Sequence, residues 1–137
     1  MRNILIATHS GLAQGFYESV KFFNNEAENI HYINAYVENN DFEEEFLTKV
    51  EELSGSTLFV FTDIPGGTVN RIASKYIPKY GYKVISGINL AIILEIALST
   101  EELPEESIEN MIASSREQLI FMNPLMEGLE KEEVKND

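Results

Sequence analysis

The sequence predicts an α/β fold: a doubly wound, mainly parallel sheet in the strand order two-one-three-four, with helices on both faces. Short apolar runs alternate with longer amphipathic segments along the chain, which is the pattern of strand–helix–strand units with right-handed crossovers. The first run, Met1–Thr8, has little polar alternation, as expected of a strand that is covered on both faces. The length of 137 residues suits one domain with its own core.

Two helices and a strand follow the first run. Apolar residues recur at intervals of four, four and three in Leu12–Asn24, which predicts a helix with one buried face. The same spacing returns after Asp41, where Asp41 and Glu44 have the spacing of an acidic capping box that opens a second helix. Between these helices, Ile30–Val37 is rich in aromatic and β-branched residues and is predicted to be the second strand.

The middle of the chain repeats the strand–helix pattern. Thr57–Asp63 is an apolar run that ends at Pro65-Gly66-Gly67, and it is predicted to be the third strand. Thr68 is a good N-cap for a third helix, which Pro78 to Gly81 should break. Lys83–Ser86 is then a short fourth strand, and Leu90–Leu98 is an almost wholly apolar helix.

The C-terminal part is less regular. Pro104 has the first-turn position of a further helix that runs to about Ser114. Gln118–Met122 is a candidate last strand, and the charged tail from Glu127 to Asp137 is expected to be frayed. We therefore predict one domain over residues 1–126 and a tail over residues 127–137.

Composition excludes several classes of protein. Acidic residues outnumber basic ones by 23 to 10, which argues against a nucleic-acid-binding protein. The chain has no cysteine and two histidines, so disulfides are excluded and a histidine-rich metal site is not expected. The longest apolar stretch, Leu90–Leu98, contains Glu95 and is too short to span a membrane. Without a recognisable signal peptide, the chain is expected to be soluble and cytoplasmic, with no cofactor and no membrane insertion.

A histidine and an aspartate end two strands that this fold places side by side. The first strand leads into His9, and the third leads into Asp63. In doubly wound sheets ligands bind outside the carboxyl ends of the strands, where the strand order reverses. A carboxylate fixes the tautomer of a neutral imidazole and stabilises the cation that forms as the ring attacks phosphorus. We therefore expect His9 to be a phosphoryl-carrying nucleophile and Asp63 its orienting partner.

Two small-residue turns are expected to hold the phosphoryl group. Backbone amides at helix N-termini bind anions, and glycines allow close approach. The predicted phosphoryl-binding residues lie at the starts of the first and third helices: Ser10, Gly11, Gly66, Gly67 and Thr68. Arg71, in the first turn of the third helix, is a candidate for a further contact. His31 and Glu95 are interpreted as structural residues.

Three separated motifs give the chain a family resemblance. Ile-Ala-Thr-His-Ser-Gly after the first strand, Phe-Thr-Asp-Ile-Pro-Gly-Gly-Thr-Val-Asn after the third and Val-Ile-Ser-Gly-Ile-Asn-Leu after the fourth resemble the mannose-family IIA component of the bacterial sugar phosphotransferase system (PTS). The resemblance implies that His9 accepts a phosphoryl group from HPr and passes it to a IIB component, while Asp63 orients the ring. Sugar would enter through membrane IIC and IID components. It also implies a homodimer that exchanges a C-terminal strand, for which Gln118–Met122 is the candidate.

Alternative functions remain open at this stage. The phosphotransfer subunit of dihydroxyacetone kinase shares the histidine motif. A receiver-like regulatory domain would instead carry the phosphoryl group on Asp63, but such domains need an acidic pair after the first strand, where this chain has His9-Ser10. A flavodoxin-like flavin protein needs a hydroxyl-rich phosphate loop at that position, of which Thr8-His9-Ser10-Gly11 is a poor version. A non-catalytic interaction module leaves the pairing of His9 with Asp63 unexplained.

Overall fold

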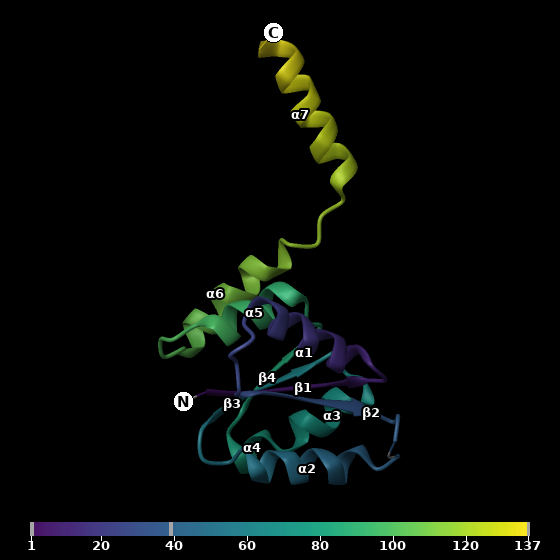
Figure 1. Ribbon diagram of the computed structural model, residues 1–137, viewed down its shortest axis with the longest axis vertical. Helices are drawn as coiled ribbons and strands as arrows, with labels where there is room; N and C mark the ends of the chain where they lie inside the picture. Colours follow the sequence, from purple (N-terminus) through teal and green to yellow (C-terminus); the bar gives the residue numbers. More distant parts are fainter. Residues whose placement is uncertain (1, 39, 137) are drawn as a thin grey trace. The chain divides into compact units, whose positions relative to one another are not determined.

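Four parallel strands form the central sheet in the order β2-β1-β3-β4, which confirms the predicted order (Figure 1). The computed structural model describes residues 2–38 and 40–136. The strands are β1 (Arg2–His9), β2 (Ile30–Ala35), β3 (Thr57–Thr62) and β4 (Lys83–Ser86). β1 and β3 pair in register from Arg2 with Thr57 to Ala7 with Thr62, so their carboxyl ends lie together at one edge of the sheet.

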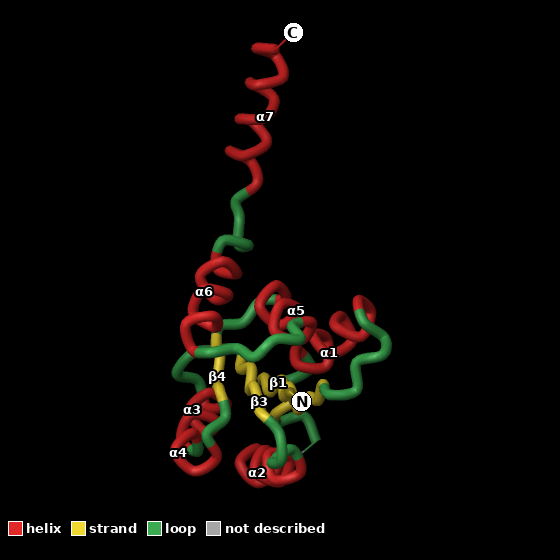
Figure 2. Tube along the Cα trace, turned by 90° about the vertical axis from the view of Figure 1, so that its left-hand side faces the viewer, coloured by secondary structure: helices red, strands yellow, loops and turns green. Residues whose placement is uncertain are grey.

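Helices cover both faces of the sheet, as the sequence predicts (Figure 1, Figure 2). One layer contains α1 (Leu12–Phe23) and α5 (Leu90–Leu98). The other contains α2 (Phe42–Glu52), α3 (Thr68–Lys75) and the short α4 (Ile77–Tyr80). Each crossover returns the chain to the start of a parallel strand. The turn that follows β1 and the turn that follows β3 therefore lie at the same edge of the sheet, at the carboxyl ends of the strands.

The core lies on both sides of β1. Ile4, Leu5, Ile6 and Ala7 are fully buried, as the continuous apolar run predicts for a central parallel strand. Phe42 and Phe46 of α2 pack against one face in a tilted ring pair 5.5 Å apart. In α1 the predicted apolar stripe is buried at Val20, whereas Leu12 and Phe23 at the two helix ends are half-exposed.

Two helix boundaries differ in detail from the predictions. Asp41 caps α2 as expected, since its carboxylate accepts the N–H of Glu44 at 3.1 Å. Thr68, however, is the first residue of α3, and Gly67 is its N-cap. Pro78 does not end the helical structure but lies in the first turn of α4, where a proline needs no N–H donor. Gly81, with φ of +71°, ends that helix.

The chain divides into two compact units, Met1–Thr100 and Glu101–Asp137. Within the second unit, α6 (Glu105–Arg116) follows Pro104 as predicted, and α7 (Met122–Asn136) is helical where the tail was expected to be frayed. The predicted strand at Gln118–Met122 is not formed: residues 117–121 are turn and irregular chain. A strand needs a neighbour for its backbone hydrogen bonds, whereas the methionine, leucine, glutamate and lysine residues that follow favour a helix. Exchange of this segment in a dimer and the domain boundary at residue 127 stay predictions.

Candidate functional site

His9 and Asp63 meet at the carboxyl edge of the sheet. His9 is the last residue of β1, and Asp63 follows the last residue of the adjacent β3. Asp63 Oδ2 accepts the backbone N–H of His9 at 3.0 Å and lies 3.1 Å from the Nδ1 atom of the same residue. One carboxylate oxygen thus contacts both the backbone and the ring of His9, which fixes the imidazole relative to the sheet.

The environment of this pair favours the ionised form of Asp63 and leaves the His9 side chain partly exposed to solvent. The Asp63 side chain is 10% exposed and the His9 side chain is 37% exposed. Burial by itself opposes ionisation of Asp63, but the His9 backbone N–H, the His9 ring and local backbone donors outweigh it and lower the pKa of the carboxyl. The N–H of Ile64 adds a further bond to Oδ1 at 3.0 Å. An anion beside Nδ1 holds the ring proton there, so Nε2 is the nitrogen left to act as a nucleophile.

Tyr36 is a neighbour of the site that the sequence motifs do not reveal. Its ring lies 5.8 Å from the His9 ring, centre to centre, at an angle of 31°. Tyr36 has φ of +65° and Ser10 has φ of +55°, and these are the two non-glycine residues with positive φ in the described chain. Such conformations are costly for residues with a Cβ and concentrate at functional sites. The sequence could have indicated Tyr36 only through the topology, because the second strand also ends at this edge of the sheet.

Side chains of the fold take up several amides at the start of α1. The buried Thr8 hydroxyl accepts the N–H of Ala13 at 2.6 Å, and Asn34 Oδ1 accepts the N–H of Gln14 at 3.1 Å. The N–H of Ser10 donates to the carbonyl of Ala35 at 3.0 Å. The amide of Ser10 therefore already has an acceptor, whereas its hydroxyl is on an exposed residue. Gly11, the N-cap of α1, has no such bond within the described residues.

The turn after Asp63 is held closed by Asn70. Asn70 Oδ1 accepts the N–H of Gly66 at 2.9 Å, and Asn70 Nδ2 donates to the Thr62 hydroxyl at 3.1 Å. The N–H of Gly67 donates to the carbonyl of Ile64 at 3.0 Å. The amides of Gly66 and Gly67, predicted to bind a phosphoryl group, thus already have acceptors. Thr68, the first residue of α3, is exposed and remains as a donor at this helix N-terminus.

The motif Val-Ile-Ser-Gly-Ile-Asn-Leu, at β4 and the start of α5, packs against the turn that follows Asp63. Gly87 has φ of +72°, and a Cβ atom built there would lie 3.4 Å from the ring of Pro65, so the chain approaches the turn closely at this point. Asn89 caps α5 by accepting the N–H of Ile92 at 3.0 Å. The motif therefore packs the start of α5 and the Pro65 turn together.

The remaining candidate residues lie outside the pair. The side chain of Arg71 is exposed on α3 and makes no hydrogen bond or ion pair with His9 or Asp63 in the part of the chain described. Glu95 is exposed on α5. His31, in β2, has its pKa lowered by burial first and by the nearby Lys49 second. No group of His, Asp or Glu side chains that could hold a metal ion occurs among residues 2–38 and 40–136, and none of the helices described there is long and apolar enough to cross a membrane.

One family model and several solved structures are similar to this chain. The model of the EIIA-man family, described as "PTS system fructose IIA component", matches residues 3–123. A structure described as a phosphoenolpyruvate-dependent sugar phosphotransferase system permease from Klebsiella pneumoniae subsp. pneumoniae is similar with a TM-score of 0.83 and 26% identity, over 91% of this chain and 93% of that one. The PTS component EIIA from Streptococcus agalactiae gives 0.76 and 27%, over 90% and 99%. The mannose/sorbose-specific IIA subunit from Enterococcus faecalis gives 0.77 over 89% and 95%, and at 18% identity it shows the fold alone. No curated protein matches the sequence significantly.

Proposed function

This chain belongs to the mannose/fructose-type IIA family of the sugar phosphotransferase system, and we propose that it carries the phosphoryl group of that system on Nε2 of His9. The observation that carries the proposal is the double contact of Asp63 Oδ2 with the His9 backbone and with Nδ1. That contact fixes both the orientation of the ring and its tautomer, which a nucleophilic imidazole requires.

The transfer itself needs no change in the protonation of His9. The lone pair on Nε2 attacks the phosphorus of a phosphohistidine on HPr, the new P–N bond forms, and the old P–N bond breaks with its electron pair returning to the donor ring. The Nδ1 proton stays on His9, where ionised Asp63 stabilises the positive charge that develops on the ring. Transfer to a IIB component repeats the same exchange in the other direction.

The donors that support the transferred phosphoryl group belong to the predicted phosphoryl-binding residues. We propose the amides of Gly11 and Thr68 and the hydroxyls of Ser10 and Thr68, because the amides of Ser10, Gly66 and Gly67 are bonded elsewhere. Both amides lie at helix N-termini, which favour anions. Such local donors counter a net charge of −13 that would otherwise repel a phosphoryl group.

The geometry disfavours the receiver-like alternative. Both carboxylate oxygens of Asp63 accept N–H donors, and the side chain is 10% exposed, so the carboxylate is placed as an acceptor rather than as an attacking group. The kinase-linked alternative differs only in the proteins that donate and accept the phosphoryl group. We also propose a cytoplasmic homodimer, which the exposed Leu119, Ile120 and Phe121 would support as a covered apolar segment.

The test is an intact-mass assay after incubation with phosphoenolpyruvate, enzyme I and HPr. His9→Ala should abolish a single acid-labile phosphoryl adduct, while His31→Ala, the matched variant at the other histidine, should retain it. An adduct that survives in His9→Ala would refute the assignment. An adduct formed from acetyl phosphate with magnesium, and lost in Asp63→Asn, would support the receiver-like reading instead.

A further inference from the structure

The outer edge of β2 presents unpaired backbone groups. The N–H of Ile4 donates to Asn29 O at 2.9 Å, and the N–H of Ser10 donates to Ala35 O at 3.0 Å. Because backbone groups alternate in direction along a strand, the odd-numbered residues of β2 face β1. Ile30, Tyr32 and Asn34 therefore direct their N–H and C=O groups away from the sheet. In the sheet that the described residues form, β2 is an edge strand with no neighbour on that side.

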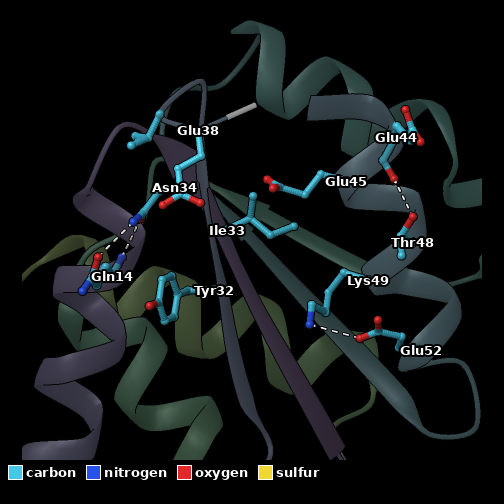
Figure 3. Close-up of a pocket in the computed structure, with 11 residues that line it drawn as sticks. Gln14, Tyr32, Ile33, Asn34, Glu38, Glu44, Glu45, Thr48, Lys49 and Glu52 are labelled. Atoms are coloured by element: carbon cyan, nitrogen blue, oxygen red, sulfur yellow. Dashed lines mark hydrogen bonds and ion pairs between the residues drawn. The ribbon is translucent and has the colours of Figure 1, made fainter. Parts of the chain in front are cut away.

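A groove of about 610 Å³ runs beside this edge (Figure 3). Tyr32, Ile33 and Asn34 form its floor, Gln14 of α1 lies on one side, and residues of α2 form the other side. The side chains of Glu38, Glu45 and Lys49 extend into the space, as Figure 3 shows. The groove therefore combines hydrogen-bonding backbone with a wall on each side, which is the arrangement that a strand added to a sheet requires.

The charge of the groove indicates which kind of chain segment can bind there. Its lining contains four glutamates, Glu38, Glu44, Glu45 and Glu52, and one lysine, Lys49, which pairs with Glu52 at 3.0 Å. Charged residues beside an edge strand prevent pairing between identical copies, and here each copy has a net charge of −13. The same charges attract a segment of opposite sign. A second copy of this chain is thus disfavoured, and a basic partner is favoured.

We propose that the β2 edge binds an extended segment of another protein, rich in lysine or arginine at every second position, which adds as a strand beside β2. Side chains alternate between the two faces of a strand. One set would face the glutamates of α2, on the side to which Ile33 packs with Phe42 and Phe46. The other set would face Tyr32, whose ring packs on Tyr17 of α1 at 4.8 Å. The basic positions therefore belong to the first set.

Hydrogen exchange at single amides tests the strand addition directly. The probe is an acetylated and amidated octapeptide of alternating lysine and threonine, added to the full chain. At a peptide concentration ten times its Kd, exchange at the outward amides of Ile30, Tyr32 and Asn34 should slow about tenfold. The inward amides of His31, Ile33 and Ala35 already face β1 and exchange only through opening, so they report how far binding stabilises the whole chain. Outward amides whose exchange does not slow would overturn the proposal.

Two matched comparisons separate pairing from simple charge attraction. The same peptide with N-methyl groups on alternate amides keeps its charge but cannot pair, so it should not bind; equal binding would overturn strand addition. Glu38→Gln with Glu45→Gln should weaken binding about threefold or more, and Glu130→Gln with Glu132→Gln, at exposed sites on α7, should not. Equal loss in both pairs, equal binding of a glutamate–threonine peptide, or self-association through this edge would contradict the choice of partner.

Discussion

Replacement of Asp63 by asparagine removes a charge and leaves the shape of the side chain almost unchanged. The carboxylate uses two oxygens for three donors: Oδ2 faces the backbone N–H and Nδ1 of His9, and Oδ1 faces the N–H of Ile64. An amide has only one oxygen. Its NH₂ group must therefore face either the His9 donors or the Ile64 N–H, and the ring loses its anionic partner in both cases.

The size of the effect follows from these contacts. Loss of one charge-assisted hydrogen bond costs about 1.5–3 kcal/mol. If that loss falls on the transition state of transfer, the rate drops roughly ten- to a hundredfold, since about 1.4 kcal/mol corresponds to a factor of ten. A buried N–H left facing another donor lowers the free energy of unfolding by about 1–3 kcal/mol. Asp63→Asn should thus give a protein that folds but transfers the phosphoryl group slowly.

The assay measures the rate of phosphoryl transfer from phosphorylated HPr by rapid quench, together with ¹⁵N chemical shifts of the His9 ring. Asp41→Asn is the matched control, because Asp41 caps α2 away from the site and asparagine caps helices equally well. We expect slow transfer and a population of the Nε2–H tautomer in Asp63→Asn alone. An unchanged rate with an unchanged tautomer would refute the role assigned to Asp63.

The pH dependence of stability offers a second check on the same residue. The pKa of Asp63 is lowered in the folded protein, so below about pH 4 the unfolded chain binds a proton that the native chain does not. The stability that this carboxylate contributes is therefore complete above its ordinary pKa and is lost as the pH falls through the folded pKa. The difference in free energy of unfolding between wild type and Asp63→Asn should shrink over that range, as measured by urea unfolding at several pH values.

Two further predictions concern the support of the site, and a third concerns His31 of β2. Thr8→Val leaves the N–H of Ala13 without its acceptor and should lower the free energy of unfolding in urea by about 1–3 kcal/mol, whereas Thr8→Ser should not. Asn70→Ala removes the hydrogen bonds from Gly66 and to Thr62, and it should lower the free energy of unfolding by a similar amount, measured by thermal unfolding. Asn70→Asp keeps the acceptor for Gly66 and should have an intermediate effect. Equal losses of stability in the two variants would contradict the bridging role. Burial lowers the pKa of His31, so stability should fall as the pH drops below about 6.5, and His31→Gln should remove that fall; an unchanged pH profile would count against it.

The sequence was sufficient to predict the parts of the site that depend on topology. The apolar run of β1 and its end at His9 gave the position of one residue, and the end of β3 gave Asp63. Their contact at 3.1 Å follows from the strand order, because adjacent parallel strands end at the same edge. The family resemblance was confirmed by the match over residues 3–123.

Other parts depend on competition between neighbours that periodicity does not encode. Gly66 was predicted to bind a phosphoryl group because a glycine allows close approach and lies beside a helix start, but Asn70 Oδ1 accepts the N–H of the same residue. Tyr36 was missed because its positive φ arises from the path of the chain after β2 rather than from a motif. The predicted strand at Gln118–Met122 failed for a related reason: a strand at the end of a chain depends on a partner edge, which the sequence of one copy does not specify.

The arrangement of donors fits the phosphoryl carrier that we propose, which must release the group that it binds. Thr8, Asn34 and Asn70 satisfy amides at the two helix starts nearest His9, so few donors remain to face a phosphoryl group. Each additional donor would stabilise the phosphorylated protein relative to the next carrier and would slow the onward transfer. In the mechanism that we propose, Asp63 orients the nucleophile while the phosphoryl oxygens meet few donors in a chain of net charge −13, and this arrangement favours rapid exchange over tight retention.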